Sequence, residues 1–170
     1  MTYIEKLTKL NACGKAVEFC RGHRSLQSAW DACERGDWML WLLGKLSGPS
    51  ESASRRKLVL AACQCARLSL RHVPKGEMRP LTAVRTAERW ARREEGVTLE
   101  MVRDAADAAD AAAYAAADAA DAADAAGAAA IAAADAAYAA YAAARVEVLK
   151  RCAAIVRKAY PRAPRLRGAK

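Results

Sequence analysis

Residues 104–144 form an alanine tract whose composition and spacing favour one kind of secondary structure. Of these 41 residues 29 are Ala, and the other twelve recur at every third or fourth position. Alanine has the highest helix propensity of all residues, and steps of three or four keep residues on one side of an α-helix. The tract therefore predicts an all-α protein that contains a long alanine-rich helix or a helical hairpin.

Gly127 is the one strong interruption of helix propensity between residue 98 and Tyr160. A continuous helix of that length would extend roughly 90 Å, far beyond a body formed by the residues that precede it. A glycine costs only about 1 kcal/mol inside a helix, so it permits a break without forcing one. We expect two helices that meet near Gly127, because each half can then pack against the rest of the chain.

The residues before the tract carry the start and stop signals of several short helices. Asn11 and Ser25 are candidate N-caps, while Gly22 and Gly36 are candidate stops. The segment 37–46 is apolar nearly all round, which is typical of a helix in the centre of a core. These signals predict a helical body with a hydrophobic centre.

Along the whole chain these signals predict a bundle of about six or seven helices. We expect one domain over residues 1–160, with short helices in 1–97 and alanine-rich helices in 98–160. Thr98 is the expected N-cap of the first alanine-rich helix. Residues 161–170 hold two prolines and four basic residues with little to bury, so we expect a mobile basic tail.

The residues of the tract that are not alanine form a polar stripe. Its first half carries six Asp. Alanine methyl groups let a neighbouring helix approach to about 8 Å, so we expect the alanines to pack and the aspartates to face solvent. The stripe has two interpretations, a solvated face or a surface that binds a basic partner. The residues that would contact such a partner are Asp107, Asp110, Tyr114, Asp118, Asp121 and Asp124.

Charge is divided unevenly between the tract and the rest of the chain. The net charge is +9, and the tract holds seven Asp without Lys or Arg, so the other residues together carry +16. A basic body can contact phosphates, which makes nucleic-acid binding an alternative function. The lack of a groove-reading motif and the repulsion of phosphate by the aspartates argue against it. The candidate phosphate contacts are Arg55, Arg56, Arg92, Arg93, Arg162, Arg165 and Arg167.

The sequence offers no constellation for catalysis, a cofactor or a metal ion. Six cysteines lack a zinc-binding spacing, and Cys63 and Cys65 would point about 200° apart on a helix, so they cannot share an ion. His23 and His72 lack a partner at a catalytic spacing. We therefore expect a protein that is not an enzyme, with no cofactor, no metal and reduced thiols.

Neither the first ten residues nor the tract predicts contact with a membrane. The first ten residues are charged throughout and do not form a secretory signal, and the aspartates make a bilayer crossing costly. We expect a cytoplasmic protein. Ice binding is a remote alternative, because ice-binding alanine-rich helices commonly present regularly spaced Thr and the tract has none.

Residues 77–91 carry an acid-x-Arg-Pro segment and a helix of the form A-V-x-x-A-x-x-W-A, and the alanine tract follows after a spacer. This order resembles the alanine-rich immunity proteins associated with bacterial polymorphic-toxin systems, and it is similar to alanine-rich proteins of phage and actinobacterial genomes. The resemblance implies an all-α cytoplasmic protein that binds and neutralises a toxin or effector. The acidic stripe would suit a basic toxin or nuclease. The matching residues are Glu77, Arg79, Pro80, Ala83, Val84, Ala87, Trp90 and Ala91.

Overall fold

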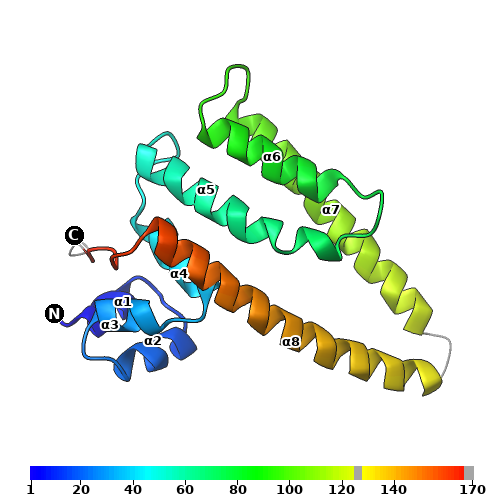
Figure 1. Cartoon of the computed structure of the whole chain (residues 1–170), viewed down its shortest axis with the longest axis horizontal. Coiled ribbons are helices and arrows are strands. Elements are labelled where there is room, and N and C mark those ends of the chain that lie inside the picture. Colours follow the sequence, from blue (N-terminus) through cyan, green and yellow to red (C-terminus); the bar gives the residue numbers. More distant parts are fainter. Residues whose placement is uncertain (125–127, 167–170) are drawn as a thin grey trace. The chain divides into compact units, whose positions relative to one another are not determined.

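The computed structural model describes residues 1–124 and 128–166, except for the side chains of residues 72, 112–124 and 128–143. Within these residues the chain forms eight α-helices and one 3-10 turn, and it forms no strand (Figure 1). The predicted all-α class is confirmed. The elements are α1 (Tyr3–Lys9), α2 (Gly14–Arg21), α3 (Leu26–Ala32), α4 (Gly36–Leu46), α5 (Ala53–Arg67), η1 (Leu70–His72), α6 (Arg79–Ala91), α7 (Leu99–Asp124) and α8 (Ala128–Ala159).

The chain divides into two compact units. The first combines Met1–Ala62 with Leu149–Lys170, and the second is the continuous segment Cys63–Val148. The boundaries fall inside α5 and α8 and not at residue 97, where the sequence suggested a change from short to alanine-rich helices. One domain over residues 1–160 stays a prediction.

The core of the first unit combines the short helices with the last turns of α8. Trp30 and Met39 are buried, and Ala153 and Val156 on α8 have no exposed surface. The apolar segment that forms α4 contributes Leu42 and Leu43 to the buried set, as its composition predicts. Figure 1 shows the last part of α8 beside α4. The first unit is therefore completed by residues from both ends of the sequence.

Gly36 begins α4, and the prediction that it ends the preceding helix is wrong. That helix, α3, ends at Ala32. A Cβ added at Gly36 would lie 2.7 Å from the backbone nitrogen of Ala153 and closer still to the side chain of Cys152. Real Cβ atoms do not approach other atoms so closely. Glycine is required here because the start of α4 touches the backbone of α8.

Asn11 is not an N-cap, because α2 begins at Gly14. Asn11 lies just after α1 in the left-handed region, with φ of 62°. Its N–H donates to the Thr8 carbonyl at 2.9 Å, and the next N–H, of Ala12, donates to the Leu7 carbonyl at 3.1 Å. These two bonds form a Schellman motif, which ends a helix and is compatible with Asn.

Two predicted N-caps are confirmed, and one helix start was missed. The Ser25 hydroxyl oxygen accepts a hydrogen bond from the Ser28 N–H at 3.1 Å, and Thr98 accepts one from Met101 at 3.2 Å. The missed start is α1, where Thr2 and Glu5 form a reciprocal capping box. Its signature of Thr followed by Glu three residues later is visible in the sequence.

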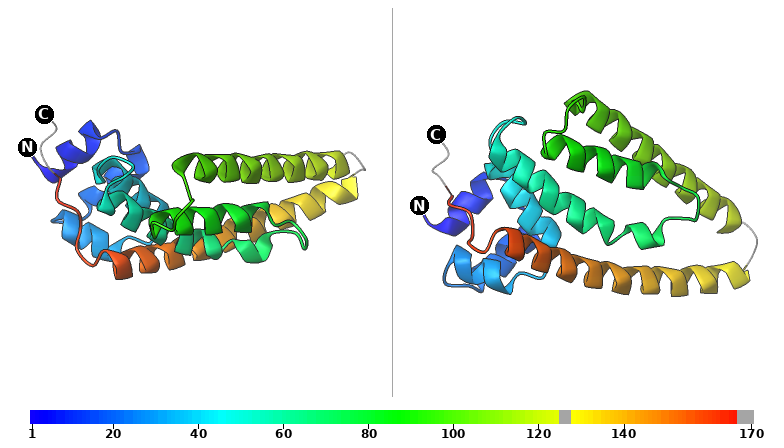
Figure 2. Two further views of the ribbon diagram at one scale, coloured as in Figure 1. Left: turned by 90° about the horizontal axis from the view of Figure 1, so that it is seen from above. Right: turned by 45° about the horizontal axis from the view of Figure 1, so that its top comes forward.

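In the second unit α6 packs against α7 (Figures 1 and 2). Leu99, Val102, Ala105 and Ala109 are partly buried, and they lie three or four residues apart on α7. This spacing places them on one face of the helix. In its described part, α7 therefore buries an apolar and alanine face, as the sequence predicts.

Within residues 161–166 of the predicted mobile tail, Ala163 and Leu166 form hydrogen bonds with side chains of the helices in the first unit. The Ala163 N–H donates to the side-chain oxygen of Gln27 at 2.8 Å, and the ammonium of Lys6 donates to the Leu166 carbonyl at 3.1 Å. Residues 167–170 lie outside the described residues.

The alanine tract is helical in α7 and in α8, up to Asp124 and again from Ala128. Residues 125–127, including Gly127, lie outside the described residues, so the hairpin stays a prediction. In the part of the chain that the structure describes, no helix combines the length and hydropathy needed to cross a bilayer.

Candidate functional site

The structure describes the side chains of only the first aspartates of the predicted acidic stripe. Asp107 and Asp110 are exposed, as is Asp104 one turn earlier. These carboxylates lie on α7 away from its partly buried face. The side chains of Tyr114, Asp118, Asp121 and Asp124 lie outside the described residues.

The three aspartates of the tract whose side chains are described differ from most other described acidic residues in their pairing. Among the described residues, Asp104, Asp107 and Asp110 make neither an ion pair nor a side-chain hydrogen bond. Seven basic side chains of the described residues pair with other acids, mostly Glu. These pairs are Arg21–Glu18, Arg35–Asp37, Arg56–Glu51, Arg67–Glu88, Arg79–Glu77, Arg89–Glu94 and Lys150–Glu34.

The predicted phosphate-contacting arginines fall in both units of the chain. Arg55, Arg56, Arg162 and Arg165 belong to the first unit, whereas Arg92 and Arg93 belong to the second. Arg167 lies outside the described residues.

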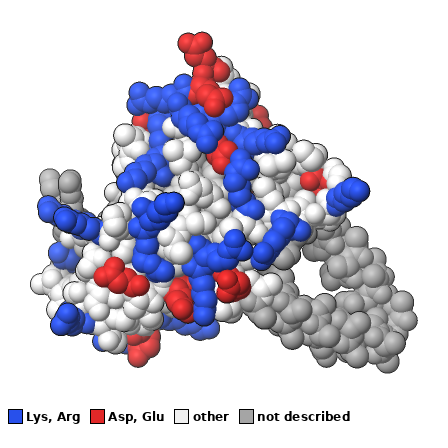
Figure 3. All heavy atoms as spheres, viewed as in Figure 1, with Lys and Arg blue, Asp and Glu red and all other residues white. Residues whose placement is uncertain are grey.

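Two of these arginines are committed to contacts within the chain. The Arg55 guanidinium donates to the Gly48 carbonyl at 3.3 Å, and Arg56 pairs with Glu51 and has only 15% of its side chain exposed. On the face shown in Figure 3, basic and acidic side chains are interspersed.

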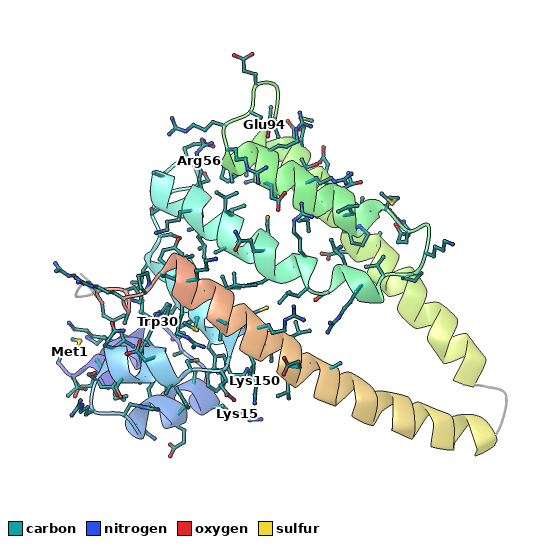
Figure 4. The ribbon with its side chains drawn as sticks, in the orientation of Figure 1. Met1, Lys15, Trp30, Arg56, Glu94 and Lys150 are labelled. Atoms are coloured by element: carbon teal, nitrogen blue, oxygen red, sulfur yellow. The ribbon has the colours of Figure 1, made fainter. Side chains whose placement is uncertain are left out.

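Helices α1 to α4 surround an apolar cavity of about 450 Å³. Its aromatic walls are Phe19, Trp30, Trp38 and Trp41. Trp30, labelled in Figure 4, is buried, and the other three rings are half-buried. No pattern in the sequence indicates a cavity among these rings.

An ion pair forms the main polar part of the cavity wall. The Arg35 guanidinium donates to the two carboxylate oxygens of Asp37 at 2.9 and 2.6 Å, and it lies 4.3 Å from the centre of the Trp38 ring. Burial alone would raise the pKa of Asp37, but the hydrogen bonds and positive charge of Arg35 outweigh burial and lower that pKa. The pair is therefore charged at neutral pH and carries no net charge.

Three thiols also line the cavity, at different depths. Cys13 is exposed, Cys20 is half-buried and Cys33 is buried. Burial is the main cause that raises the pKa of both Cys20 and Cys33. The two inner thiols are therefore protonated and neutral at physiological pH, which leaves the interior of the cavity without free charge.

An ion pair in the second unit connects the exposed Arg67 of α5 to the buried Glu88 of α6. The Arg67 guanidinium donates to both carboxylate oxygens of Glu88 at 2.8 and 2.7 Å, and only 10% of the Glu88 side chain is exposed. Hydrogen bonding to Arg67 is the main cause that lowers the pKa of Glu88. Sequence reasoning missed this pair. The sequence pattern that could have revealed the ion pair is an acid beside Ala87 and Ala91 on the apolar face of a helix.

The acid-x-Arg-Pro segment has a structural role at the start of α6. The Glu77 carboxylate accepts hydrogen bonds from the backbone N–H and the guanidinium of Arg79, both at 2.9 Å. These bonds lower the pKa of Glu77 to about 2. Trp90 and Ala91, further along the same pattern, are buried. The residues that carry the family resemblance therefore begin and pack a helix.

The described residues contain no group of three His, Cys, Asp or Glu side chains placed to hold a metal ion. His23 packs against Phe19 and lies 3.3 Å from the Ser28 hydroxyl. Comparison with protein-family models, with curated proteins and with solved structures finds no match to this chain.

Proposed function

We propose that this protein is a non-enzymatic binding module of the immunity or inhibitor type, which neutralises a basic toxin or effector in the cytoplasm. The observation that supports the proposal best is the exposed and unpaired row of Asp104, Asp107 and Asp110. Carboxylates without partners among the described residues are free to pair with a second protein. The family resemblance agrees with this role.

A row of unpaired acids on a basic protein also orients a partner. A cationic surface is repelled by the basic remainder of the chain and attracted by the aspartates. Charge complementarity of this kind raises the rate of association and rejects wrong partners. The proposed contacts are those of the sequence prediction, namely Asp107, Asp110, Tyr114, Asp118, Asp121 and Asp124.

The partner is to be found by co-purification from the native host, and affinity is then measured by calorimetry with the purified pair. Changing Asp107, Asp110, Asp118 and Asp121 to Lys should abolish binding while circular dichroism and the unfolding temperature remain close to those of the parent. The control changes Glu95 and Glu147 to Lys, because both are exposed acids outside the stripe. Unchanged affinity in the stripe variant rejects the stripe as the contact surface.

A helical hairpin of α7 and α8 would present the stripe along one edge. We infer this arrangement from the alanine faces, which favour close packing. Spin labels at Ala111 and Arg145 would be roughly 50 Å apart on a continuous helix and less than half that distance in a hairpin. Double electron–electron resonance on a Cys13→Ser background distinguishes the two, and a distance near 50 Å rejects the hairpin.

Nucleic-acid binding is the second candidate. The exposed neighbours Arg92 and Arg93, and the exposed Arg162 and Arg165, favour it. Phosphate contacts would make the affinity for a mixed-sequence duplex fall steeply as salt rises. If micromolar protein fails to shift such a duplex at low salt, nucleic-acid binding is excluded as the function.

A further inference from the structure

The cavity between α1 and α4 is larger than a packing defect. Protein interiors contain few voids larger than a water molecule, and an engineered cavity of about 150 Å³ already binds benzene. The present cavity measures about 450 Å³. It falls in the range of sites for small molecules, which is about 300–1,000 Å³. By this comparison it has room for two or three aromatic rings.

The walls of the cavity select for an uncharged molecule. Among the described residues that line it, the charged groups are Arg35 and Asp37, and these neutralise each other in two hydrogen bonds. A charged molecule would lose its hydration without finding a free countercharge inside. The aromatic walls, in contrast, offer large flat surfaces that favour stacked or edge-to-face contact with other rings.

We propose that this cavity is a binding site for a small, neutral aromatic molecule of two or three rings. Phe19, Trp38 and Trp41 form the half-buried walls, and Trp30 and Met39 form buried ones. Every residue that lines the site belongs to the first unit, whereas the acidic stripe belongs to the second. The proposal does not depend on the function proposed above.

The cavity opens to solvent near Asn11 and Cys13, which are the exposed residues of its lining. A molecule that fills the cavity must pass this side and cover it at least in part. The Cys13 thiol therefore reports occupancy, since a bound molecule slows its reaction with a thiol reagent.

The probe is N-phenyl-1-naphthylamine, a neutral fluorescent molecule with three aromatic rings, added to the full-length protein. We expect saturable binding to one site with a dissociation constant on the order of 10 µM. Probe emission should rise on excitation of tryptophan, because three indoles line the site. No saturable binding up to the solubility limit of the probe overturns the proposal.

Filling the cavity tests the location of the site. Ala16 lines the cavity and is half-buried, so Ala16→Trp should weaken probe binding at least tenfold. The matched control is Ala32→Trp, at an exposed alanine of the same unit that does not line the cavity. It should bind within twofold of the parent. A folded Ala16→Trp variant with parental affinity overturns the assignment.

A second measurement on the unaltered protein decides the matter if Ala16→Trp does not fold. Saturating probe should slow the modification of Cys13, followed by mass spectrometry, about tenfold. An unchanged rate at saturation places the probe elsewhere and overturns the proposal. If a protein partner protects Cys13 and the probe does not bind, the cavity takes a side chain of that partner. This outcome also overturns the proposal.

Discussion

The indole N–H of Trp30 donates a hydrogen bond to the carbonyl oxygen of Tyr160 at 3.0 Å. This bond joins α3 to the residue that follows the last helix, 130 positions along the chain. Tyr160 is itself fixed there, since its N–H donates to the Val156 carbonyl at 2.7 Å. A buried indole thus satisfies a carbonyl group that the end of α8 leaves without a helical partner.

Trp30→Phe tests this bond. The variant keeps a buried ring but removes the donor, so we expect a loss of about 2 kcal/mol in the free energy of unfolding, from the unpaired carbonyl and the smaller ring. Urea denaturation gives the value. Trp41→Phe, at a half-buried indole, is the control and should lose less. Equal losses in the two variants would show that the bond adds nothing.

Gly36→Ala should destabilise the first unit by about 1–3 kcal/mol, because the added methyl overlaps the backbone of α8 at Ala153. Gly14→Ala is the control, since a Cβ at Gly14 has no atom within 4 Å. That control should be neutral or slightly stabilising, as alanine restricts the unfolded chain. Both values come from urea denaturation. A neutral Gly36→Ala would contradict the close approach.

Arg93→Gly should stabilise the protein by up to about 1 kcal/mol. Arg93 follows α6 with φ of 62°, and its N–H donates to the Trp90 carbonyl at 3.0 Å. Glycine adopts this left-handed conformation without the steric cost that a Cβ imposes. Arg92→Gly removes the same charge at a right-handed position and should destabilise instead. Thermal unfolding measures both effects: the unfolding temperature should rise in Arg93→Gly and fall in Arg92→Gly.

Glu88 makes the free energy of unfolding of the protein depend on pH in the acidic range. Its pKa is lower in the folded protein than its ordinary value of 4.5, chiefly through the hydrogen bonds from Arg67. The stabilisation is therefore fully present above pH 4.5 and is lost as pH falls through the lower, folded pKa.

Urea unfolding between pH 6 and pH 3 measures this contribution. The parent should lose more stability over that interval than Glu88→Gln, which cannot titrate. Glu95→Gln, at an exposed acid, should retain the parental slope. Parallel curves for the parent and Glu88→Gln would mean that the ion pair is not linked to folding.

Thiol reactivity should follow burial. Cys13 is exposed, and Cys20 is half-buried. Burial raises the pKa of Cys63 to about 11, and the nearby Glu88 carboxylate adds to this effect, so its reactive thiolate is scarce. At pH 8 an aromatic disulfide reagent should modify Cys13 first. The buried thiols Cys33, Cys63, Cys65 and Cys152 should react only on unfolding.

Cys13→Ser should remove the fast phase of this reaction and leave the slow phase unchanged. Fast modification of three or more thiols in the folded parent would contradict the packing of these helices.

Local signals in the sequence predicted much of the fold, because they act over three or four residues. Ser25 and Thr98 cap helices as their chemistry favours. Three residues of the apolar segment 37–46 are buried, namely Met39, Leu42 and Leu43. Glycine was a mixed signal, because Gly22 is the C-cap of α2 as expected. Gly36 was expected to end a helix, but its role depends on Ala153, more than a hundred residues away, which local patterns do not reveal.

The candidate site was less predictable than the fold. The exposure of Asp107 and Asp110 followed from their spacing, but the aromatic cavity needed the mutual placement of four short helices. Trp38 lies at the cavity wall, with the Arg35 guanidinium 4.3 Å from the centre of its ring. Helical spacing predicts which face of its helix a ring lies on. It does not predict whether side chains of the neighbouring helices fill the space next to that ring.

The contribution of residues 149–166 to the first unit determines the order in which the chain can fold during synthesis. Ala153 and Val156 are fully buried in that unit, so its core is incomplete until the ribosome has passed both residues. The second unit is one continuous segment, Cys63–Val148, and all of it has been translated by then. Residues 1–62 are translated before the second unit, yet they can complete their core only after Ala153 and Val156 have been made.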